Sequence, residues 1–256
     1  MQGTVQVGLF DVSGNPERPV TTPAQSRTFV SYQEPRAPER QRHLVYIPPP
    51  FREDDLGVLH AMVDRARLGV LVSSDSEGLQ ASHVPMLLDS DAGPYGTLTC
   101  HLARANAQSR ALRHDSEVMI VFRAEDAYVS PSWYATKGET GKVVPTWLYV
   151  AVHAYGRPRV IDDPDALRTI VTRLTEKQEA PRRDPWAVTD APASYIAALL
   201  GGIVGVEIPI ARLEGKWKLD QDGSDADVRG AIEGLRSSED HRDRETADAM
   251  ERRRTG

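Results

Sequence analysis

The chain has 256 residues, of which 40% are hydrophobic and 27% charged, and its formal net charge of −6 at pH 7 argues against a general nucleic-acid-binding surface. A single cysteine, Cys100, excludes an internal disulfide and is typical of a reducing compartment. The longest apolar run, residues 196–206, is too short to cross a bilayer and the first residues lack the pattern of a secretory signal, so we expect a cytoplasmic protein with no membrane partner.

The two ends of the chain carry no core pattern. Residues 1–42 contain several prolines among polar and charged residues, which predicts a flexible extension. Residues 236–256 mix acidic and basic residues with few apolar ones, which predicts a charged, solvated and partly helical tail. The folded domain is therefore expected over residues 43–235.

Hydrophobic periodicity predicts the elements of this domain. Helices are expected near residues 56–66, 105–114, 163–180, 192–200 and 224–235. Strands are expected near residues 68–74, 79–89, 96–103, 117–123, 127–134, 143–161 and 202–219. Because most neighbouring strands are linked by turns and few helices intervene, the pattern favours an antiparallel barrel over a parallel sheet, in a mainly β fold with flanking helices (α+β).

Several stretches in this order resemble the PaiB family, which is also described as FMN-binding negative transcriptional regulators. The motifs are "YIPPPF", "ASHVP", "HLARANAQ", "YVSPSWY", "VVPTWLYVAVHAYG", "GIVGVEI" and "LEGKWKLDQD", spread from about residue 44 to residue 235. The resemblance implies a split β-barrel of the FMN-binding and pyridoxamine-phosphate-oxidase type. It also implies a homodimer with FMN between the subunits and a small-molecule ligand or substrate. A nucleic-acid partner follows only by analogy with the family.

The motif "HLARAN" is the expected phosphate site of such a barrel, because it stands at a strand end. Arg104 can place its guanidinium on phosphate oxygens, and backbone N–H groups at the start of the 105–114 helix add positive potential. The alternative is that Asn106 only caps the helix while Arg104 is solvated.

Two further segments are candidates for the cofactor site. In "ASHVP", strand alternation places Ser82 and Val84 on one face and His83 on the other, toward a pocket or a dimer partner. The loop of residues 135–142 is flanked by aromatic residues and carries Lys142, so it could close over a cofactor or be a simple hairpin. The cofactor-binding residues predicted in full are Ser82, His83, Val84, Pro85, His101, Leu102, Ala103, Arg104, Asn106, Lys142, Thr146 and Trp147.

The sequence leaves other functions open. Piperazate synthases, which use haem to form an N–N bond, also resemble this family, and a haem b cofactor would make His83 the axial metal ligand. A cofactor-free scaffold is the third alternative. It draws on departures from the family pattern: Leu148 stands where asparagine is usual, and Asp220 and Asp222 occupy the last motif.

Overall fold

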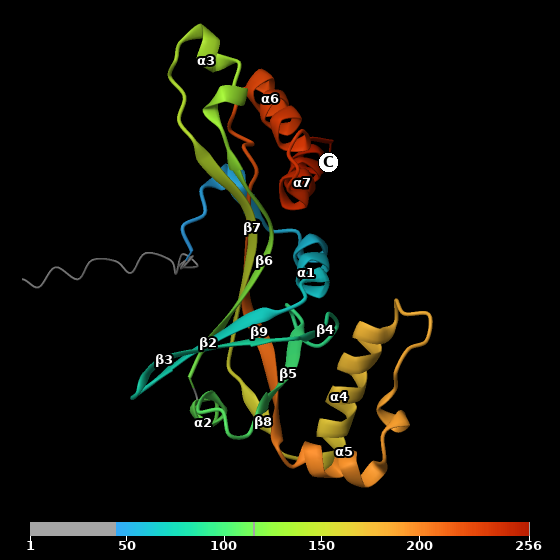
Figure 1. Cartoon of the computed structure of the whole chain (residues 1–256). Helices are drawn as coiled ribbons and strands as arrows, with labels where there is room; N and C mark the ends of the chain where they lie inside the picture. Colours follow the sequence, from blue (N-terminus) through green and yellow to red (C-terminus); the bar gives the residue numbers. More distant parts are fainter. Residues whose placement is uncertain (1–44, 115, 256) are drawn as a thin grey trace, which may run out of the picture. The chain divides into compact units, whose positions relative to one another are not determined.

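The strands of the domain run antiparallel to their neighbours and belong to one sheet (Figure 1). The computed structural model describes residues 45–114 and 116–255, so the extension predicted for residues 1–42 lies outside the described residues. The strands are β1 (Arg52–Glu53), β2 (Gly69–Asp75), β3 (Gly78–Val84), β4 (Leu87–Asp89), β5 (Thr97–Ala103), β6 (Val118–Val129), β7 (Thr146–Gly156), β8 (Arg159–Ile161) and β9 (Ile203–Lys218). Their order in the sheet is β3-β2-β6-β7-β9-β5-β4, and β1 and β8 also pair with β9.

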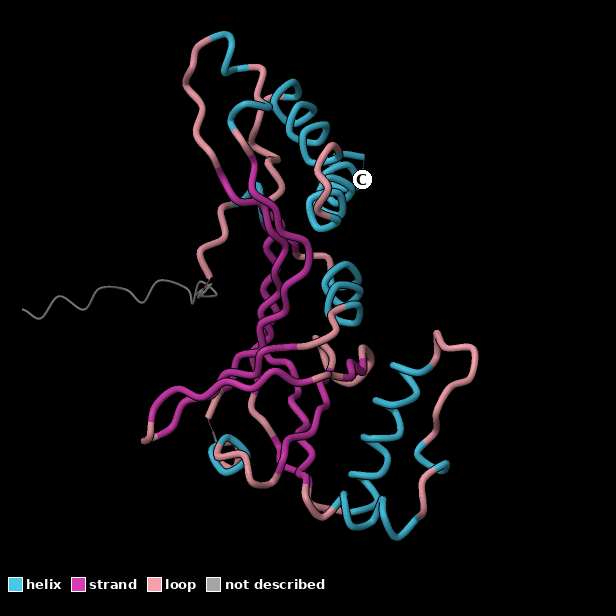
Figure 2. The backbone as a smooth tube through the Cα atoms, in the orientation of Figure 1, coloured by secondary structure: helices cyan, strands magenta, loops and turns pink. Residues whose placement is uncertain are grey.

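Helices lie in some of the connections between strands and after the last strand (Figure 2). They are α1 (Leu56–Arg65), α2 (Gln108–Ala111), α3 (Thr136–Glu139), α4 (Pro164–Glu179), α5 (Ala193–Leu200), α6 (Asp225–Arg236) and α7 (His241–Thr255). Short 3-10 turns occur at Pro49–Phe51, Pro131–Trp133 and Val188–Asp190. The mainly β fold with flanking helices that the sequence predicts, a split β-barrel, is confirmed.

Alternation along the strands separates a core face of the sheet from an outer face. On β6, Ile120 and Phe122 are buried, whereas Met119 and Val121 between them are half-buried. The same alternation runs along β7, where Leu148 is fully buried. Because side chains directly opposite on paired strands point to the same side, the strand register carries this division across the sheet.

The polar segment after β5 connects this side of the sheet to β2 and β3 at the opposite side. Gln108, on α2, is buried, and its Nε2 lies 3.0 Å from the carbonyl oxygen of Leu71 and 3.0 Å from Ser73 Oγ, both on β2. Asn106 Nδ2 donates to Ser82 Oγ on β3 at 3.0 Å. These side-chain bonds replace a backbone ladder between β3 and β5, and so they hold the barrel together at its split.

Helices α1 and α7 lie over the core face of the long strands. Helix α7 packs against α6 and β6, and α1 packs against β4 and β7. A Cβ atom at Gly215 of β9 would lie 2.3 Å from a methyl group of Leu59, so glycine at this position lets α1 approach the sheet closely. At the other end of the domain, α4 and α5 pack on each other, and α4 contacts β5 and β9.

The prediction of a solvated tail at residues 236–256 is wrong for α7. The described residues 45–114 and 116–255 belong to one structural unit, and Thr246, Ala247, Ala249 and Met250 are buried, the last three of them in the main core. These four residues have the i, i+3, i+4 spacing of one helix face, which the surrounding charged residues hide in the composition. Charge alone therefore did not distinguish this packed helix from a solvated segment.

Other differences concern the limits of elements. The strands predicted at residues 117–123 and 127–134 are one strand, β6, with an irregular register between Arg123 and Asp126. The long strand predicted over residues 143–161 is divided into β7 and β8. The helix predicted at residues 105–114 is reduced to the four residues of α2, because Asn106 holds the chain in a turn before it.

Candidate functional site

Arg104, the predicted phosphate ligand, is bound by three acceptors of the protein itself. Its guanidinium donates to the carbonyl oxygens of Gly201 at 3.1 Å and Ile203 at 2.8 Å, and to Asp162 Oδ1 at 2.7 Å. Arg113 also contacts Asp162, and the two guanidinium groups lower the pKa of this carboxyl to about 2. Arg104 thus fixes the end of β5 to the start of β9, and a phosphate there would have to displace one of these acceptors.

Asn106 caps the turn that follows. Its Oδ1 accepts from the backbone N–H of Gln108 at 3.0 Å, while its amide holds Ser82. Since α2 has only four residues, it provides little helix dipole for an anion. The sequence left helix capping and anion binding open, alone or together. The bond from Asn106 to Gln108 is that of an Asx turn, while the N-cap of α2 is Ala107, which makes no side-chain capping bond.

The remaining residues of the two strand motifs face different environments. Leu102 and Val84 are buried in the core, whereas Ala103 is exposed and Pro85 half-buried. His101 pairs with Gly205 of β9, and burial lowers its pKa. Its Nδ1 is buried and has no hydrogen-bond partner among the described residues.

The outer face of the sheet aligns His83 with a second histidine, His153. The register pairs His83 with Val70, Val70 with Val121, Val121 with His153, and His153 with Glu214. All five side chains therefore point to the same side. His83 is exposed, and both valines and His153 are half-buried, so solvent reaches an apolar strip that has a histidine at each side.

A charged and aromatic cluster continues this face on β7 and β9. The Arg212 guanidinium lies 3.8 Å from the centre of the Tyr155 ring, and Arg212 Nε is 3.4 Å from Glu214 Oε1. Burial lowers the pKa of His153, and the charge of Glu214 acts in the opposite direction. His153 Nδ1 and both Nε and Nη2 of Arg212 are buried without a hydrogen-bond partner in the described part of the chain. Such buried polar atoms are uncommon unless another molecule, such as a ligand or an ordered water, satisfies them.

Two lysines near the end of β9 extend the cluster toward the start of β7. Lys216 Nζ lies 5.1 Å from the centre of the Tyr149 ring and donates to the carbonyl oxygen of Tyr46 at 3.0 Å. Lys218 Nζ donates to Thr146 Oγ1 and to the carbonyl oxygen of Trp147. We call the surface formed by the following residues the outer strand face: His83, Val70, Val121, Tyr149, His153, Tyr155, Arg212, Glu214, Lys216 and Lys218.

The predicted residues Thr146, Trp147 and Lys142 lie near or beyond this end. Lys218 contacts both Thr146 and Trp147. The exposed Trp147 ring packs edge-to-face on the Tyr128 ring, with 5.8 Å between the ring centres. Lys142 is exposed in the loop before β7. Of the predicted residues, Ser82 and Asn106 are therefore in direct contact, and Thr146 and Trp147 share the contact with Lys218. Arg104 does not lie on the outer strand face.

The sequence prediction missed His153, Arg212, Lys216 and Lys218. Their signal was the alternation of residues 146–156 and 203–218, in which polar and aromatic side chains occupy one face of two long strands. The sequence does not show that the polar faces of these two strands lie side by side. That follows only from the register, which pairs His153 with Glu214 and Tyr155 with Arg212.

Two of the departures from the family pattern, Leu148 and Asp220, have structural roles, and the charge of Asp220 also acts on Lys218 at the end of this face. Leu148 is fully buried in the core, so its apolar side chain suits its position. Asp220 has a positive φ of 67° and accepts a hydrogen bond from Tyr134 Oη at 3.0 Å. These residues therefore support the fold and do not by themselves remove polar groups from the outer strand face.

Residues 45–114 and 116–255 lack two further kinds of site. That part of the chain contains no group of three or more histidine, cysteine or carboxylate side chains arranged to hold a metal ion. It also contains no helix long and apolar enough to cross a membrane.

Comparison with known proteins gives a family and several relatives. A family model described as "Putative FMN-binding domain" matches residues 45–212. An uncharacterized protein of Aspergillus fumigatus is 35% identical, with 78% of this chain and 89% of that protein covered. Protease synthase and sporulation protein PAI 2 of Bacillus subtilis is 29% identical, with 81% of this chain and 97% of that protein covered. The solved structure of an FAD and haem binding protein from Mycobacterium smegmatis aligns with a TM-score of 0.48 at 15% identity, covering 70% of this chain and 78% of that one.

Proposed function

The chain belongs to this FMN-binding domain family, and we propose that it binds FMN on the outer strand face, between two copies of the chain, for a redox or regulatory role. The observation that carries the proposal is a set of buried polar atoms without a hydrogen-bond partner among the described residues, His153 Nδ1 and Arg212 Nε and Nη2, on a face that solvent still reaches. Of these atoms, Arg212 Nε has an ion-pair contact, with Glu214. A flat ring system with several acceptor atoms is a ligand that can satisfy such donors.

Charge on this face favours an anionic ligand. Arg212, Lys216 and Lys218 bring three positive charges, against one negative charge from Glu214. We assign the FMN phosphate to the lysines of β9 because they lie on the same face as His153 and Arg212. Arg104 instead donates to acceptors of the protein at the end of β5, away from this face. The half-buried Val70 and Val121 give the ring an apolar surface.

A second copy of the chain would complete the site. Val70, Val121 and Met119 are half-buried on the same side of neighbouring strands, and apolar side chains in such a row are typical of a face that a partner covers. Covering this face also removes the exposed parts of the half-buried His153 and Arg212 side chains from water. We therefore propose a homodimer in which the outer strand faces of both copies take part.

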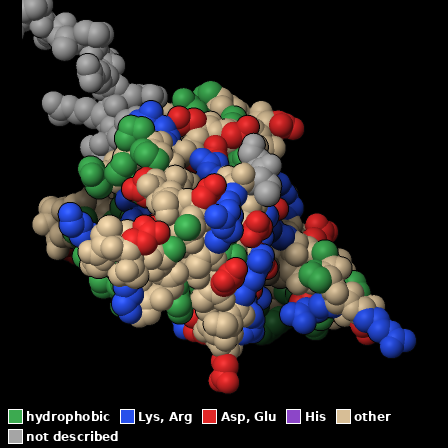
Figure 3. All heavy atoms as spheres, turned by 90° about the horizontal axis from the view of Figure 1, so that it is seen from above, with side chains coloured by type: hydrophobic (Ala, Val, Ile, Leu, Met, Phe, Trp, Pro, Cys, Tyr) green, Lys and Arg blue, Asp and Glu red, His purple; other side chains and the backbone are tan. Residues whose placement is uncertain are grey.

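The chemistry of the proposed site divides between cofactor and protein. FMN, when bound, supplies reversible one- or two-electron transfer. The residues of this chain bind its phosphate with β9 lysines, orient the ring against the valine strip and donate hydrogen bonds from His153 and Arg212. A DNA-binding role follows only from the family analogy. In the view of Figure 3, acidic and basic side chains are interspersed.

An absorption and fluorescence titration of the full chain tests the proposal. We expect FMN to bind with loss of its free fluorescence and with its visible bands retained on the protein, and riboflavin, which lacks the phosphate, to bind at least tenfold more weakly. Haemin added in parallel tests the alternative in which His83 is an axial ligand. Binding of haemin with a sharp Soret band, without binding of FMN, would contradict the flavin proposal.

A further inference from the structure

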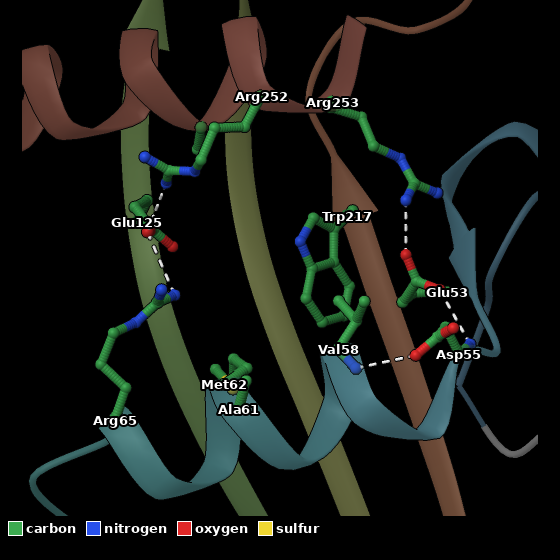
Figure 4. Close-up of a pocket in the computed structure, with 11 residues that line it drawn as sticks. Glu53, Asp55, Val58, Ala61, Met62, Arg65, Glu125, Trp217, Arg252 and Arg253 are labelled. Atoms are coloured by element: carbon green, nitrogen blue, oxygen red, sulfur yellow. Dashed lines mark hydrogen bonds and ion pairs between the residues drawn. The ribbon is translucent and has the colours of Figure 1, made fainter. Parts of the chain in front are cut away.

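A pocket of about 680 Å³ lies between α1 and α7, on the core side of the sheet (Figure 4). It is separate from the outer strand face, because Trp217 in its wall alternates along β9 with Lys216 and Lys218. This volume is within the range of small-molecule sites. One wall belongs to α7, and both α7 and Trp217 lie beyond residues 45–212, which match the family model.

The middle of the pocket is apolar and has a flat aromatic wall. Figure 4 shows the Trp217 ring between α1 and α7, with Val58 and Met62 of α1 beside it. Ala61 and Ala249 add small apolar surfaces. A planar apolar group fits between these walls, because it can stack on the indole while both helices contact its edges.

Charged residues at the two ends of the pocket differ in how tightly they are held. At one end, Arg253 forms a close ion pair with Glu53 and donates to the carbonyl oxygen of Arg52 at 3.1 Å. At the other end, Arg65 Nη2 and Arg252 Nη2 both approach the same oxygen, Glu125 Oε1, at 3.3 Å. Charge-assisted hydrogen bonds are typically about 2.7–2.9 Å long, so the contacts to Glu125 are loose and those of Arg253 are part of the fold.

Accessibility decides the charge of the ligand. The side chains of Glu53 and Glu125 are only 8% and 12% exposed, whereas that of Arg65 is 60% exposed. The exposed carboxylate of the lining, Asp55, lies beside Glu53 at the Arg253 end (Figure 4). A molecule that enters at the other end therefore meets the guanidinium of Arg65 before it meets the carboxylate of Glu125. Glu125 is the one hydrogen-bond partner of Arg65 in the described part of the chain, so most of the five donors of Arg65 are available to an anion.

We propose that this pocket binds a small aromatic carboxylate, with the ring against Trp217 and the carboxylate on Arg65. A single carboxylate suits the site better than a dianionic phosphate, since Glu125 already supplies one negative charge at that end. The proposal does not depend on FMN, because the pocket and the outer strand face use different side chains on opposite sides of β9.

Calorimetric titration of the full chain with 2-naphthoate tests this site, with the uncharged 2-naphthamide and the cationic 2-naphthylmethylammonium as comparison ligands. We expect saturable binding of one naphthoate per chain, and at least tenfold weaker binding of the amide and the ammonium. Equal binding of acid and amide, stronger binding of the ammonium, or no saturable binding of naphthoate at millimolar concentration would each overturn the proposal.

Two variants locate the site. Arg65→Gln removes the charge, and Ala61→Phe fills the pocket from an exposed position on α1. Both should weaken naphthoate binding at least tenfold and leave FMN binding unchanged. The control Arg173→Gln makes the same charge change at an exposed position on α4 and should bind naphthoate like the parent. If Arg65→Gln and Ala61→Phe, shown to be folded by circular dichroism, keep the parent affinity, the assignment to this pocket is wrong.

Discussion

Asn106 donates its side-chain amide to Ser82 Oγ across 3.0 Å, and this bond ties the loop after β5 to β3. Gln108, two residues later, contacts Leu71 and Ser73 of β2 from a fully buried position. The "HLARANAQ" motif therefore closes the split in the barrel, and the polar residues that suggested an anion site are used to hold strands together.

The first prediction follows from the burial of Gln108. Gln108→Ala leaves the acceptors on Leu71 and Ser73 without their donor and opens a cavity, so we expect the free energy of unfolding to fall by about 2–3 kcal/mol. Urea denaturation followed by circular dichroism measures this change. The control Gln178→Ala, at an exposed position of α4, should change stability by less than about 0.5 kcal/mol. Equal stability of the two variants would show that the bridge contributes nothing.

Helix α7 should contribute to the stability of the domain. Met250 is fully buried in the main core, so Met250→Ala should lower the free energy of unfolding by about 2–4 kcal/mol, and ending the chain at residue 240 should lower the thermal midpoint clearly. Differential scanning calorimetry measures both. Glu245→Ala, an exposed substitution on the same helix, is the matched control. A truncated chain that melts like the parent would mean that α7 behaves as the solvated tail expected from its composition.

The domain should lose stability on mild acidification. Burial lowers the pKa values of His101 and His153 below the ordinary 6.5. Because the unfolded chain then takes up protons that the folded chain does not, the free energy of unfolding falls as pH decreases from about 6.5 toward the lowered folded-state pKa values, and above about 7 it does not depend on these groups. Urea denaturation between pH 5.5 and 7.5 measures this slope. His153→Gln and His101→Gln should each reduce it, and an unchanged slope in both variants would contradict the assignment.

The sequence predicted the fold class and the family, but not the arrangement of the site. Strand alternation and ordered motifs were sufficient for a split barrel, and the resemblance to PaiB is confirmed by the similarity to PAI 2. The role of Arg104 was not predictable, because its acceptors Asp162, Gly201 and Ile203 are 58 to 99 residues away in the chain. The cluster around His153 depends on the pairing of β7 with β9 for the same reason.

The proposed dimer should depend on the valine strip of the outer strand face. Val121→Glu places a charge in the middle of this strip, and we expect it to convert a dimer into a monomer, because burying an unpaired carboxylate between the two copies is costly. Size-exclusion chromatography with light scattering gives the mass. Val144→Glu introduces the same charge at an exposed loop position and should remain dimeric. A parent chain that is monomeric at micromolar concentration would contradict the interface.

The affinity of the Arg212→Gln variant for FMN shows whether the outer strand face is the FMN site. Arg212 Nε and Nη2 are buried on this face without a hydrogen-bond partner among the described residues, so we expect this variant to bind FMN at least tenfold more weakly than the parent, measured by quenching of FMN fluorescence. Arg173→Gln, an exposed arginine of α4, should bind FMN like the parent. If folded Arg212→Gln binds FMN with the affinity of the parent, the outer strand face is not the FMN site.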